Sequence, residues 1–360
     1  MKRRKIWLVS LLVVLTVTLM GCGSSTSNKS QKENTTKSSE KETGKTETKA
    51  DVDLSSVTIR FGEVGWASDQ ALLKAAGLDD TPYKIEYSTF QGGNLALEAM
   101  AADQIDFTGS SEIPPLFFAA ASNAGNFKIV AIKNSNTTLQ EVVVPKGSAI
   151  KSIADLKGKK VGYIKSTTAH YFLYEMLKSA GLNWSDIKPV EITTADGVTA
   201  LVGGQIDAFA SYGNSINAAK NNGATTLADA KDILSGNFPF EVSNSALKDD
   251  KKKAAIADLL ARLQLAFDWS NKNVDKWAQV SADPSGLSVD DNLNILKKGF
   301  AQRSTTIQPV SDSAIASEQK VEDAFSAVGM LTTKVDIKSL YDNSLAQPYQ
   351  NALTKLKAKK

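Results

Sequence analysis

Hydrophobic and polar positions alternate over short stretches in the first part of the chain, and a helical pattern follows each stretch. Val57, Ile59 and Phe61 alternate with polar residues, as in a half-buried strand. Residues 68–76 then carry apolar positions at helical spacing, and Gly77 ends that pattern. The pattern predicts a strand followed by a helix.

The same pattern recurs directly downstream. Tyr83, Ile85 and Tyr87 alternate with polar residues and predict a second strand. A helix over residues 94–102 and a third strand over residues 105–108 follow. Short strands that alternate with helices are typical of a mostly parallel sheet. We therefore expect an α/β fold.

Two distant segments of the chain resemble each other. Residues 99–106 and 200–207 each read as a helix end, a turn and a new strand, and both end in Gln-Ile-Asp. Each predicted strand runs into a polar turn, at residues 109–112 and at residues 211–214. In open parallel sheets, ligands bind beyond the carboxyl ends of the strands. The repeat favours two α/β lobes with ligand-binding residues in the polar turns.

Two apolar strands are candidates for the crossings between these lobes, at residues 141–145 and 238–243. After residue 248 the apolar positions follow helical spacing. Helices are predicted there over residues 254–269, 274–280, 288–300 and 311–328. We expect lobe 1 to comprise residues 55–144 and 239–347, lobe 2 to comprise residues 145–238, and residues 348–360 to form a basic C-terminal tail.

The amino-terminal segment has the pattern of a secretory signal peptide. Basic residues at positions 2–5 precede an apolar run over residues 6–20. A run of this length could also form a marginal transmembrane anchor. It ends, however, in Leu-Met-Gly-Cys, which resembles the lipobox of bacterial lipoproteins. We expect residues 1–21 to be removed and Cys22 to carry lipid such as palmitate, which would anchor the protein on the extracytoplasmic side of the cell membrane.

The segment after the lipobox is polar and contains almost no apolar residue. Residues 22–54 are rich in Ser, Thr, Lys and Glu, and their charges nearly cancel. Such a segment cannot bury enough apolar surface to offset its conformational entropy. We expect it to be a disordered tether.

Composition narrows the function further. The chain has 42 Lys and Arg residues and 39 Asp and Glu residues, and four of the basic residues lie in the signal peptide. The mature protein is therefore close to neutral, and no basic cluster interleaved with aromatic residues indicates nucleic-acid binding. Cys22 is the only cysteine, so the chain cannot form an internal disulfide.

The motifs of common enzyme classes are absent from the sequence. It has no G-x-S-x-G elbow, no phosphate-binding loop, no dinucleotide-binding glycine pattern and no H-E-x-x-H. His170 is the only histidine, which excludes a histidine metal cluster. A Ser, His and Asp triad could be assembled by count alone, although no motif marks a nucleophile. We expect a protein that is not an enzyme and binds neither a cofactor nor a metal.

Three consecutive hydroxyl residues, Ser166, Thr167 and Thr168, stand between a predicted strand and a predicted helix. A helix start offers unpaired backbone N–H groups and the positive end of the helix dipole, and the hydroxyl groups add further donors. A single Ser or Thr would suffice as an N-cap, which is the alternative interpretation. Three in a row favour a site for a compact oxyanion.

A longer stretch of sequence carries a resemblance to a known family. Residues 151–161 read Lys-Ser-Ile-Ala-Asp-Leu-Lys-Gly-Lys-Lys-Val, and residues 167–173 read Thr-Thr-Ala-His-Tyr-Phe-Leu. Together with residues 92–106 and 307–310, they resemble the aliphatic sulfonate, taurine and nitrate binding proteins of ABC importers. The resemblance covers nearly the whole mature domain.

This resemblance implies a type II periplasmic-binding-protein fold, in which two lobes joined by two crossing strands close on a ligand. It implies that Thr167 and Thr168 hold a sulfonate-like head group. It also implies contacts from the opposite lobe, made by Ser110, Ser111 and Glu112, and from the loop before the second helix, made by Gln91 and Gly92.

The chain departs from the family pattern after the strand of the second lobe. Tyr212, Gly213 and Asn214 stand where the family usually has Trp-Asp-Pro. Gly213 replaces the aspartate that would pair with the ammonium group of taurine, and an unpaired buried ammonium is costly. The ligand is expected to be a sulfonate with an uncharged tail or a nitrate-like ion rather than taurine.

Three further side chains are candidates for the ligand site, each with a structural alternative. Trp66 and Tyr212 could form aromatic walls around the ligand tail, or they could belong to the core. His170 could donate to the anion, although local packing is the favoured role. Asn214 belongs to the polar turn that follows the second-lobe strand.

The combined features predict a monomeric extracytoplasmic receptor that captures a small organic oxyanion and delivers it to an ABC permease in the membrane. One alternative is a receptor for nitrate or a thiamine precursor. Others are an extracytoplasmic enzyme on the same fold and an adhesion or sensory lipoprotein, because a fold does not determine a function.

Overall fold

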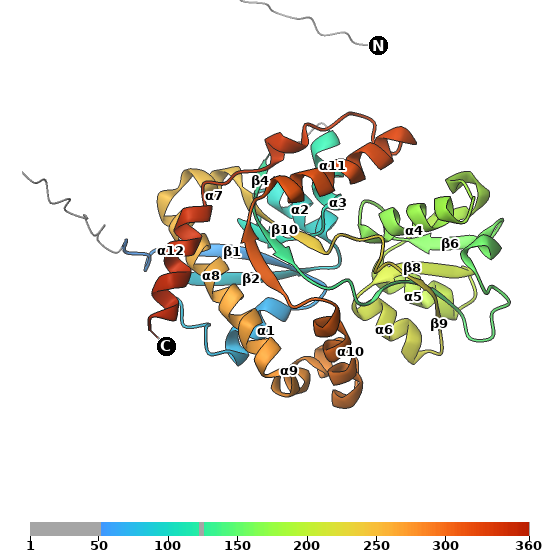
Figure 1. The fold of residues 1–360 in the computed structure, drawn as a ribbon, viewed down its shortest axis with the longest axis horizontal. Coiled ribbons are helices and arrows are strands. Elements are labelled where there is room, and N and C mark those ends of the chain that lie inside the picture. Colours follow the sequence, from blue (N-terminus) through green and yellow to red (C-terminus); the bar gives the residue numbers. More distant parts are fainter. Residues whose placement is uncertain (1–51, 122–125, 360) are drawn as a thin grey trace, which may run out of the picture. The chain divides into compact units, whose positions relative to one another are not determined.

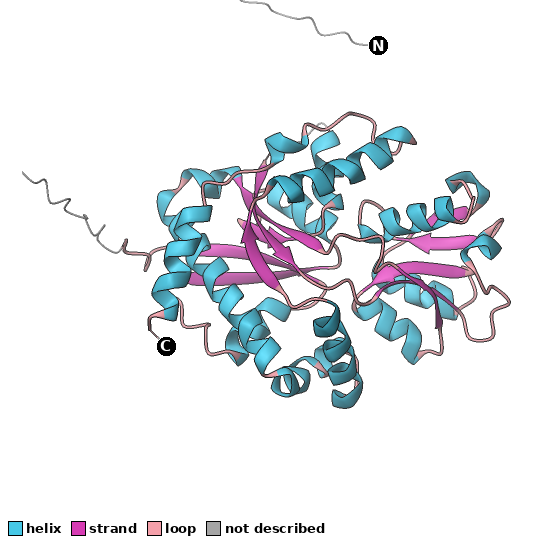
Figure 2. Cartoon of the chain, in the orientation of Figure 1, coloured by secondary structure: helices cyan, strands magenta, loops and turns pink. Residues whose placement is uncertain are grey.

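The computed structural model describes residues 52–121 and 126–359 (Figures 1 and 2). The predicted signal peptide, Cys22 and nearly all of the predicted tether lie outside these ranges. Residues 51–360 form one compact unit. Within its described part, no helix is both long enough and apolar enough to cross a membrane.

The first of two sheets has six strands in the order β11-β4-β10-β3-β1-β2. Neighbours β3, β1 and β2 are parallel, whereas β10 is antiparallel to β3 and β4, and β11 is antiparallel to β4. The strands are β1 (Thr58–Val64), β2 (Lys84–Phe90), β3 (Phe107–Gly109), β4 (Phe127–Asn134), β10 (Asn237–Ser243) and β11 (Thr306–Pro309). We call this sheet and the helices packed on it lobe 1.

The helices of lobe 1 come from both ends of the described chain (Figure 1). The amino-terminal ones are α1 (Ser68–Ala75), α2 (Gly93–Ala101) and α3 (Ile113–Ala120). The carboxy-terminal ones are α7 (Asn244–Lys248), α8 (Asp250–Lys272), α9 (Val274–Ser281), α10 (Val289–Gln302), α11 (Asp312–Ala327) and α12 (Ala346–Lys357).

The second sheet has five strands in the order β7-β6-β8-β5-β9, and with its helices it forms lobe 2. Its strands are β5 (Gln140–Val144), β6 (Lys160–Tyr163), β7 (Lys188–Glu191), β8 (Ala208–Tyr212) and β9 (Thr225–Asp229). Its helices are α4 (Thr168–Ser179), α5 (Thr194–Val202) and α6 (Asn214–Asn221). The mixed α/β fold with two sheets confirms the predicted architecture.

Each lobe has its own hydrophobic core. In lobe 1, the ring of Phe107 contacts those of Phe61 and Phe240, with centroids 4.8 and 5.2 Å apart. In lobe 2, α5 lies so close to Phe209 that a Cβ atom on Gly197 would come within 2.2 Å of that ring. Glycine at this position therefore permits the close packing of helix and sheet.

The structure differs from the predicted lobe boundaries at β5. The sequence-based division placed these residues at the end of lobe 1, but β5 pairs with β8 and β9 of lobe 2. All five residues of β5 are buried. A fully buried apolar strand carries no signal of which sheet it joins, because both faces are covered in either case. The chain crosses between the sheets at residues 135–139 and 230–236, so the predicted crossing at residues 238–243 is wrong as well, because these residues belong to the inner strand β10 of the first sheet.

The predicted C-terminal tail is also different in the structure. Most of it forms α12, which packs on α8 with Tyr349 and Leu353 buried. The lysines of this segment suggested a solvated tail, but its apolar residues recur at the spacing of one helix face. The short strand β11 was likewise not predicted, because only four residues take part in it.

Candidate functional site

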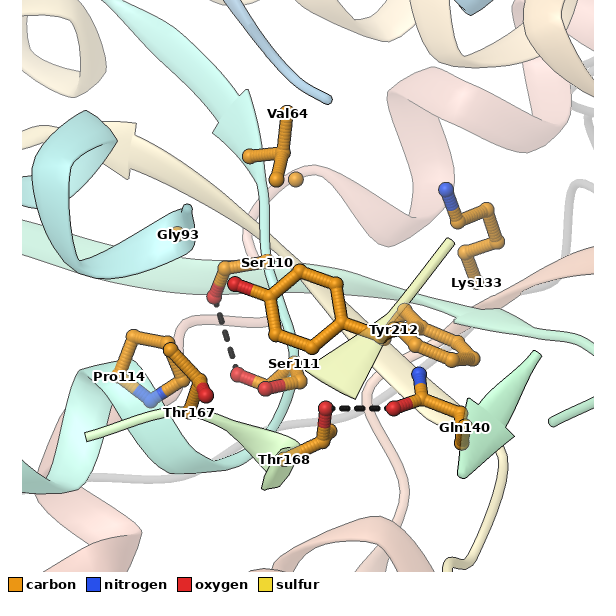
Figure 3. A pocket seen from close by; sticks show the side chains of 12 residues that line it. Val64, Gly93, Ser110, Ser111, Pro114, Lys133, Gln140, Thr167, Thr168 and Tyr212 are labelled. Carbon is orange, nitrogen blue, oxygen red and sulfur yellow. Dashed lines mark hydrogen bonds between the residues drawn. The ribbon is translucent and has the colours of Figure 1, made fainter. Parts of the chain in front are cut away.

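A cavity of about 190 Å³ lies between the two lobes (Figure 3). Its polar lining comes from Ser110, Ser111 and Lys133 of lobe 1 and from Gln140, Thr167, Thr168 and Tyr212 of lobe 2. Its apolar lining is formed by Val64, Pro114 and Phe238, together with Gly93 and Gly109. The cavity is therefore small, and hydroxyl groups face it from both sides.

The ends of three strands position the hydroxyl groups. Ser110 and Ser111 directly follow β3, the threonine pair follows β6, and Tyr212 is the last residue of β8. The turns after β3 and β8 are the ones predicted from the two similar sequence segments, and the threonine pair belongs to the hydroxyl run predicted to precede a helix. The structure brings five of the predicted residues, Ser110, Ser111, Thr167, Thr168 and Tyr212, to one cavity.

The amino-terminal end of α4 opens onto this cavity without a side-chain cap. Thr167 occupies the N-cap position, but its hydroxyl donates to the carbonyl oxygen of Ile164 at 2.7 Å. The hydroxyl of Thr168 donates to Oε1 of Gln140, also at 2.7 Å. Neither side chain satisfies the first N–H groups of the helix, so simple capping does not explain this sequence. An uncapped helix start attracts an anion through its N–H groups and its dipole.

Tyr212 adds a further hydroxyl group. Its oxygen is buried and makes no hydrogen bond within the described part of the chain. Burial raises the pKa of Tyr212 to about 12, so the phenol is neutral and can donate to a ligand. A buried polar group without a partner is uncommon and calls for a physical explanation.

Lys133 is the single cationic residue in the cavity lining. Its ammonium group lies 5.7 to 5.8 Å from the ring centroids of Phe238, Phe240 and Phe267. Cation–π contacts of this kind hold an ammonium group in an otherwise apolar setting. In Figure 3, Lys133 is separated from Pro114 and Thr167 by the ring of Tyr212. The charge can thus attract an anion without occupying the hydroxyl cluster.

Two buried carboxyl groups belong to the lobe 1 side of the site. The carboxyl group of Glu241 contacts the hydroxyl of Ser110, and burial raises the pKa of Glu241 to about 8. Glu112 accepts hydrogen bonds from Ser235 at 2.5 Å and Asn237 at 3.0 Å, and burial raises its pKa as well. Glu112, which was predicted to contact the ligand, thus binds residues near the second crossing and does not line the cavity.

Four other predicted site residues lie in neighbouring places. Trp66 stacks on Trp277 with ring centroids 6.1 Å apart, and Asn214 donates to the carbonyl oxygen of Pro284 at 2.8 Å. Gln91 and Gly92 line a separate groove, where Gln91 accepts a hydrogen bond from Thr194 of lobe 2. The structure does not bring these four residues into the cavity lining, and their contact with a ligand remains a prediction.

Ser166 and His170 complete the predicted set. Ser166 has a positive φ of 59°, and its backbone N–H donates to Nδ1 of His170 at 3.4 Å. The imidazole is buried among aromatic rings that include Phe117, Tyr163 and Trp184. Burial lowers the pKa of His170 to about 4. The histidine is therefore neutral and packs locally, as favoured from the sequence, and it lies outside the cavity lining.

Several lining residues could not be recognised in the sequence. Lys133 and Phe238 come from strands next to the two crossings, and Gln140 begins the strand that was assigned to the wrong lobe. An isolated lysine in an apolar strand carries no sign that it faces a ligand. Among the described residues, no group of three or more His, Cys, Asp and Glu side chains could hold a metal.

Two lobes with a cavity between them form the architecture of solute-binding proteins, and relatives of this chain are proteins of that class. The profile of the NMT1/THI5-like family matches residues 66–239 of this chain. An aliphatic sulfonates-binding protein of Escherichia coli K12 is 29% identical over 285 residues, which are 78% of this chain and 87% of that protein. These relationships confirm the resemblance seen in the sequence.

Solved structures support the same assignment. The alkanesulfonate-binding protein from Xanthomonas axonopodis pv. citri, bound to MOPS, superposes with a TM-score of 0.70 at 27% identity, covering 79% of this chain and 98% of that one. The desulfurization enzyme DSZB shares the fold at 16% identity, with a TM-score of 0.59 over 83% of this chain and 99% of that one. The fold thus supports binding proteins and also occurs in an enzyme.

Proposed function

We propose that this protein is the receptor of an ABC importer and captures a small aliphatic sulfonate in the cavity between its lobes. The uncapped start of α4, faced by serine hydroxyls of the other lobe, carries this proposal. A sulfonate presents three oxygens, and N–H and O–H donors from two lobes can bind them together. The names of the related proteins support the same ligand class.

The rest of the lining favours an uncharged, short tail. Val64, Pro114 and Phe238 offer apolar surface, and the cavity holds only about 190 Å³. No carboxylate is among the lining residues, and Lys133 would repel a positively charged tail. Taurine would have to bury an unpaired ammonium group, which is costly. Simple alkanesulfonates should therefore bind more tightly than taurine.

The proposal includes a location outside the cytoplasmic membrane. Lipid on Cys22 would hold the receptor there, and the polar segment up to residue 54 would let it pivot. Tethering raises the effective concentration of the receptor near its permease. A monomer suffices for this role, because both lobes of the cavity come from one chain.

A ligand panel tests the proposal. The protein is titrated with methanesulfonate, ethanesulfonate, butanesulfonate, taurine, nitrate, sulfate and a thiamine-precursor pyrimidine by calorimetry and by thermal shift. We expect the alkanesulfonates to bind and to raise the melting temperature, because a ligand that binds only the folded state stabilises it. If only nitrate or only the pyrimidine bound tightly, that compound rather than a sulfonate would be the ligand of this receptor. No binding of any compound would contradict a receptor role for this cavity.

An enzymatic role is the second candidate, because the desulfurization enzyme has the same fold. The cavity lining holds hydroxyl groups but no cysteine or histidine that could activate one of them. We propose that the protein binds its ligand without changing it. Prolonged incubation with ethanesulfonate, followed by mass spectrometry and a sulfite assay, should return the ligand intact. Release of sulfite would favour the enzyme.

A further inference from the structure

Glu241 occupies an unusual place for a carboxyl group. It lies in β10, is fully buried, and one of its oxygens contacts the hydroxyl of Ser110, which lines the cavity. Its other oxygen, Oε2, is buried and has no hydrogen-bond partner within the described residues. The backbone N–H of Ser110 donates to the carbonyl of Pro239 at 3.0 Å, so pairing of β3 and β10 fixes this contact.

The protonation state of Glu241 decides what Ser110 can offer to a ligand. A serine hydroxyl has one proton, and an ionised carboxylate can only accept. When Glu241 is ionised, the Ser110 proton is drawn to it and oxygen lone pairs are left facing the cavity. When Glu241 is protonated, the carboxyl group donates to the Ser110 oxygen, and the serine proton can point either at the carbonyl oxygen of Ser111, 3.0 Å away, or at the ligand.

We propose that Glu241 holds a proton in the liganded protein, so that capture of an oxyanion is coupled to proton uptake through Ser110. The inference rests on the proposed function and adds a positioning residue to it. An anion that enters the cavity brings a negative charge towards Glu241, which further disfavours its ionised form. Binding and protonation therefore support each other.

The charges around Glu241 are consistent with this coupling. Burial raises the pKa of Glu241 to about 8, and the hydrogen bond from Ser110 opposes that shift more than the charge of Lys133 on β4 does. On α11, the buried Glu318 lies near enough to be affected by the charges of both Glu241 and Glu112. Three elements adjoin β10. The strand β3 has no titratable side chain. On β4, the ammonium group of Lys128 donates to the carbonyl oxygen of Ser339, and Lys248 is the last residue of α7. Lys133 is thus the cation that competes with the proton.

Calorimetry with ethanesulfonate from pH 6 to pH 9.5 tests the coupling, because this sulfonate does not titrate in that range. The affinity should be constant at low pH and fall about tenfold per pH unit above about pH 8, as expected for one linked proton. Titrations in two buffers of different ionisation enthalpy should show uptake of close to one proton at the alkaline end. A flat affinity with no proton uptake would overturn the inference while leaving the receptor role intact.

Variants separate Glu241 from other titrating groups. Glu241→Gln keeps a donor for Ser110 but cannot titrate, so its affinity should be flat across the pH range. Glu318→Gln is the matched control, because it removes another buried carboxyl group and should retain the pH dependence of the wild type. Ser110→Ala should bind more weakly and show a shallower slope, because only the direct repulsion between the anion and ionised Glu241 is left. A slope as steep as that of the wild type in either Glu241→Gln or Ser110→Ala would overturn the inference.

Discussion

Asn221 in lobe 2 donates its side-chain amide to the carbonyl oxygen of Gly286 in lobe 1, at 2.8 Å. Two more asparagines on the same face of α6 make similar bonds, Asn214 to Pro284 at 2.8 Å and Asn217 to Ser285 at 3.4 Å. The spacing of these asparagines matches one side of a helix. The row of amides therefore joins the two lobes directly beside the cleft.

Replacing Asn214 and Asn221 together by alanine should weaken ligand binding. An opening rotation that separates α6 from residues 284–286 would break these bonds, so they stabilise the closed arrangement in which a ligand is held. Each exposed hydrogen bond contributes about 0.5 kcal/mol, so the two together contribute about 1 kcal/mol, and we expect about fivefold weaker binding of ethanesulfonate. Calorimetry measures the change.

Asn222→Ala provides the control for this row of amides. Its side chain bonds to the carbonyl of Ala218 within the same helix, at 2.9 Å. Its removal should leave the affinity unchanged. Equal affinities of the double variant and the wild type would show that the amides do not contribute to closure.

The threonine pair should be required for binding and much less for folding. In the variant with Thr167→Val and Thr168→Val, two hydroxyl groups at the start of α4 are lost. We expect that each hydroxyl turns from its present acceptor, the carbonyl of Ile164 or the side chain of Gln140, to the bound anion. Ethanesulfonate affinity should then fall by at least about tenfold in the variant, since hydrogen bonds to a charged group contribute about 1.5 to 3 kcal/mol each. Urea unfolding should show a loss of about 1 kcal/mol for each neutral bond removed.

An exposed threonine on α5 offers a matched control. Thr199 bonds to the backbone of its own helix, so Thr199→Val should leave ligand affinity unchanged. A threonine-pair variant that still bound ethanesulfonate like the wild type would locate the anion elsewhere.

Much of this site could be predicted from the sequence, because strand ends and helix starts leave local signals. The hydroxyl run at Ser166 to Thr168 and the polar turn at Ser110 follow predicted strands, and the structure brings most of these residues to one cavity. The same local signals also predicted site residues that do not line the cavity. Trp66 belongs to a pair of stacked indoles, and His170 lies in an aromatic cluster, since polarity and position alone do not tell a core residue from a cleft residue.

The remaining features depend on contacts between distant parts of the chain. Glu241 meets Ser110 only because β10 inserts between β3 and β4, and the sequence separation of this pair is 131 residues. Lys133 faces the cavity because two crossings bring the lobes together. A strand such as β5 is buried on both faces, so its apolar pattern identifies a strand and leaves its sheet open. The topology of the fold, rather than the local sequence pattern, determines the contact of Glu241 with Ser110, the position of Lys133 and the sheet that β5 joins.

Lys133 should control affinity and tail preference together. In Lys133→Met, the cavity loses the cation of its lining while the stem packs on the same rings. We expect about tenfold weaker binding of ethanesulfonate, a weaker dependence on salt, and a smaller preference for ethanesulfonate over taurine. Lys128→Met on the same strand is the control, because its ammonium donates to the carbonyl of Ser339 away from the cavity. An unchanged ratio of the two affinities would contradict the role of Lys133 in rejecting a charged tail.

His170 should make the protein less stable in mild acid. Burial lowers the pKa of His170 to about 4 from an ordinary value of 6.5, so the unfolded chain binds a proton more readily than the folded one. Stability from the neutral imidazole is complete above pH 6.5 and is lost as the pH falls from there towards 4. Between pH 7 and pH 5 this amounts to about 2 kcal/mol. Urea unfolding of the wild type and of His170→Gln at pH 7 and at pH 5 measures this difference in unfolding free energy. The variant lacks the contribution of His170, while all other groups still titrate. The same loss of stability in both proteins would assign the acid sensitivity to other residues.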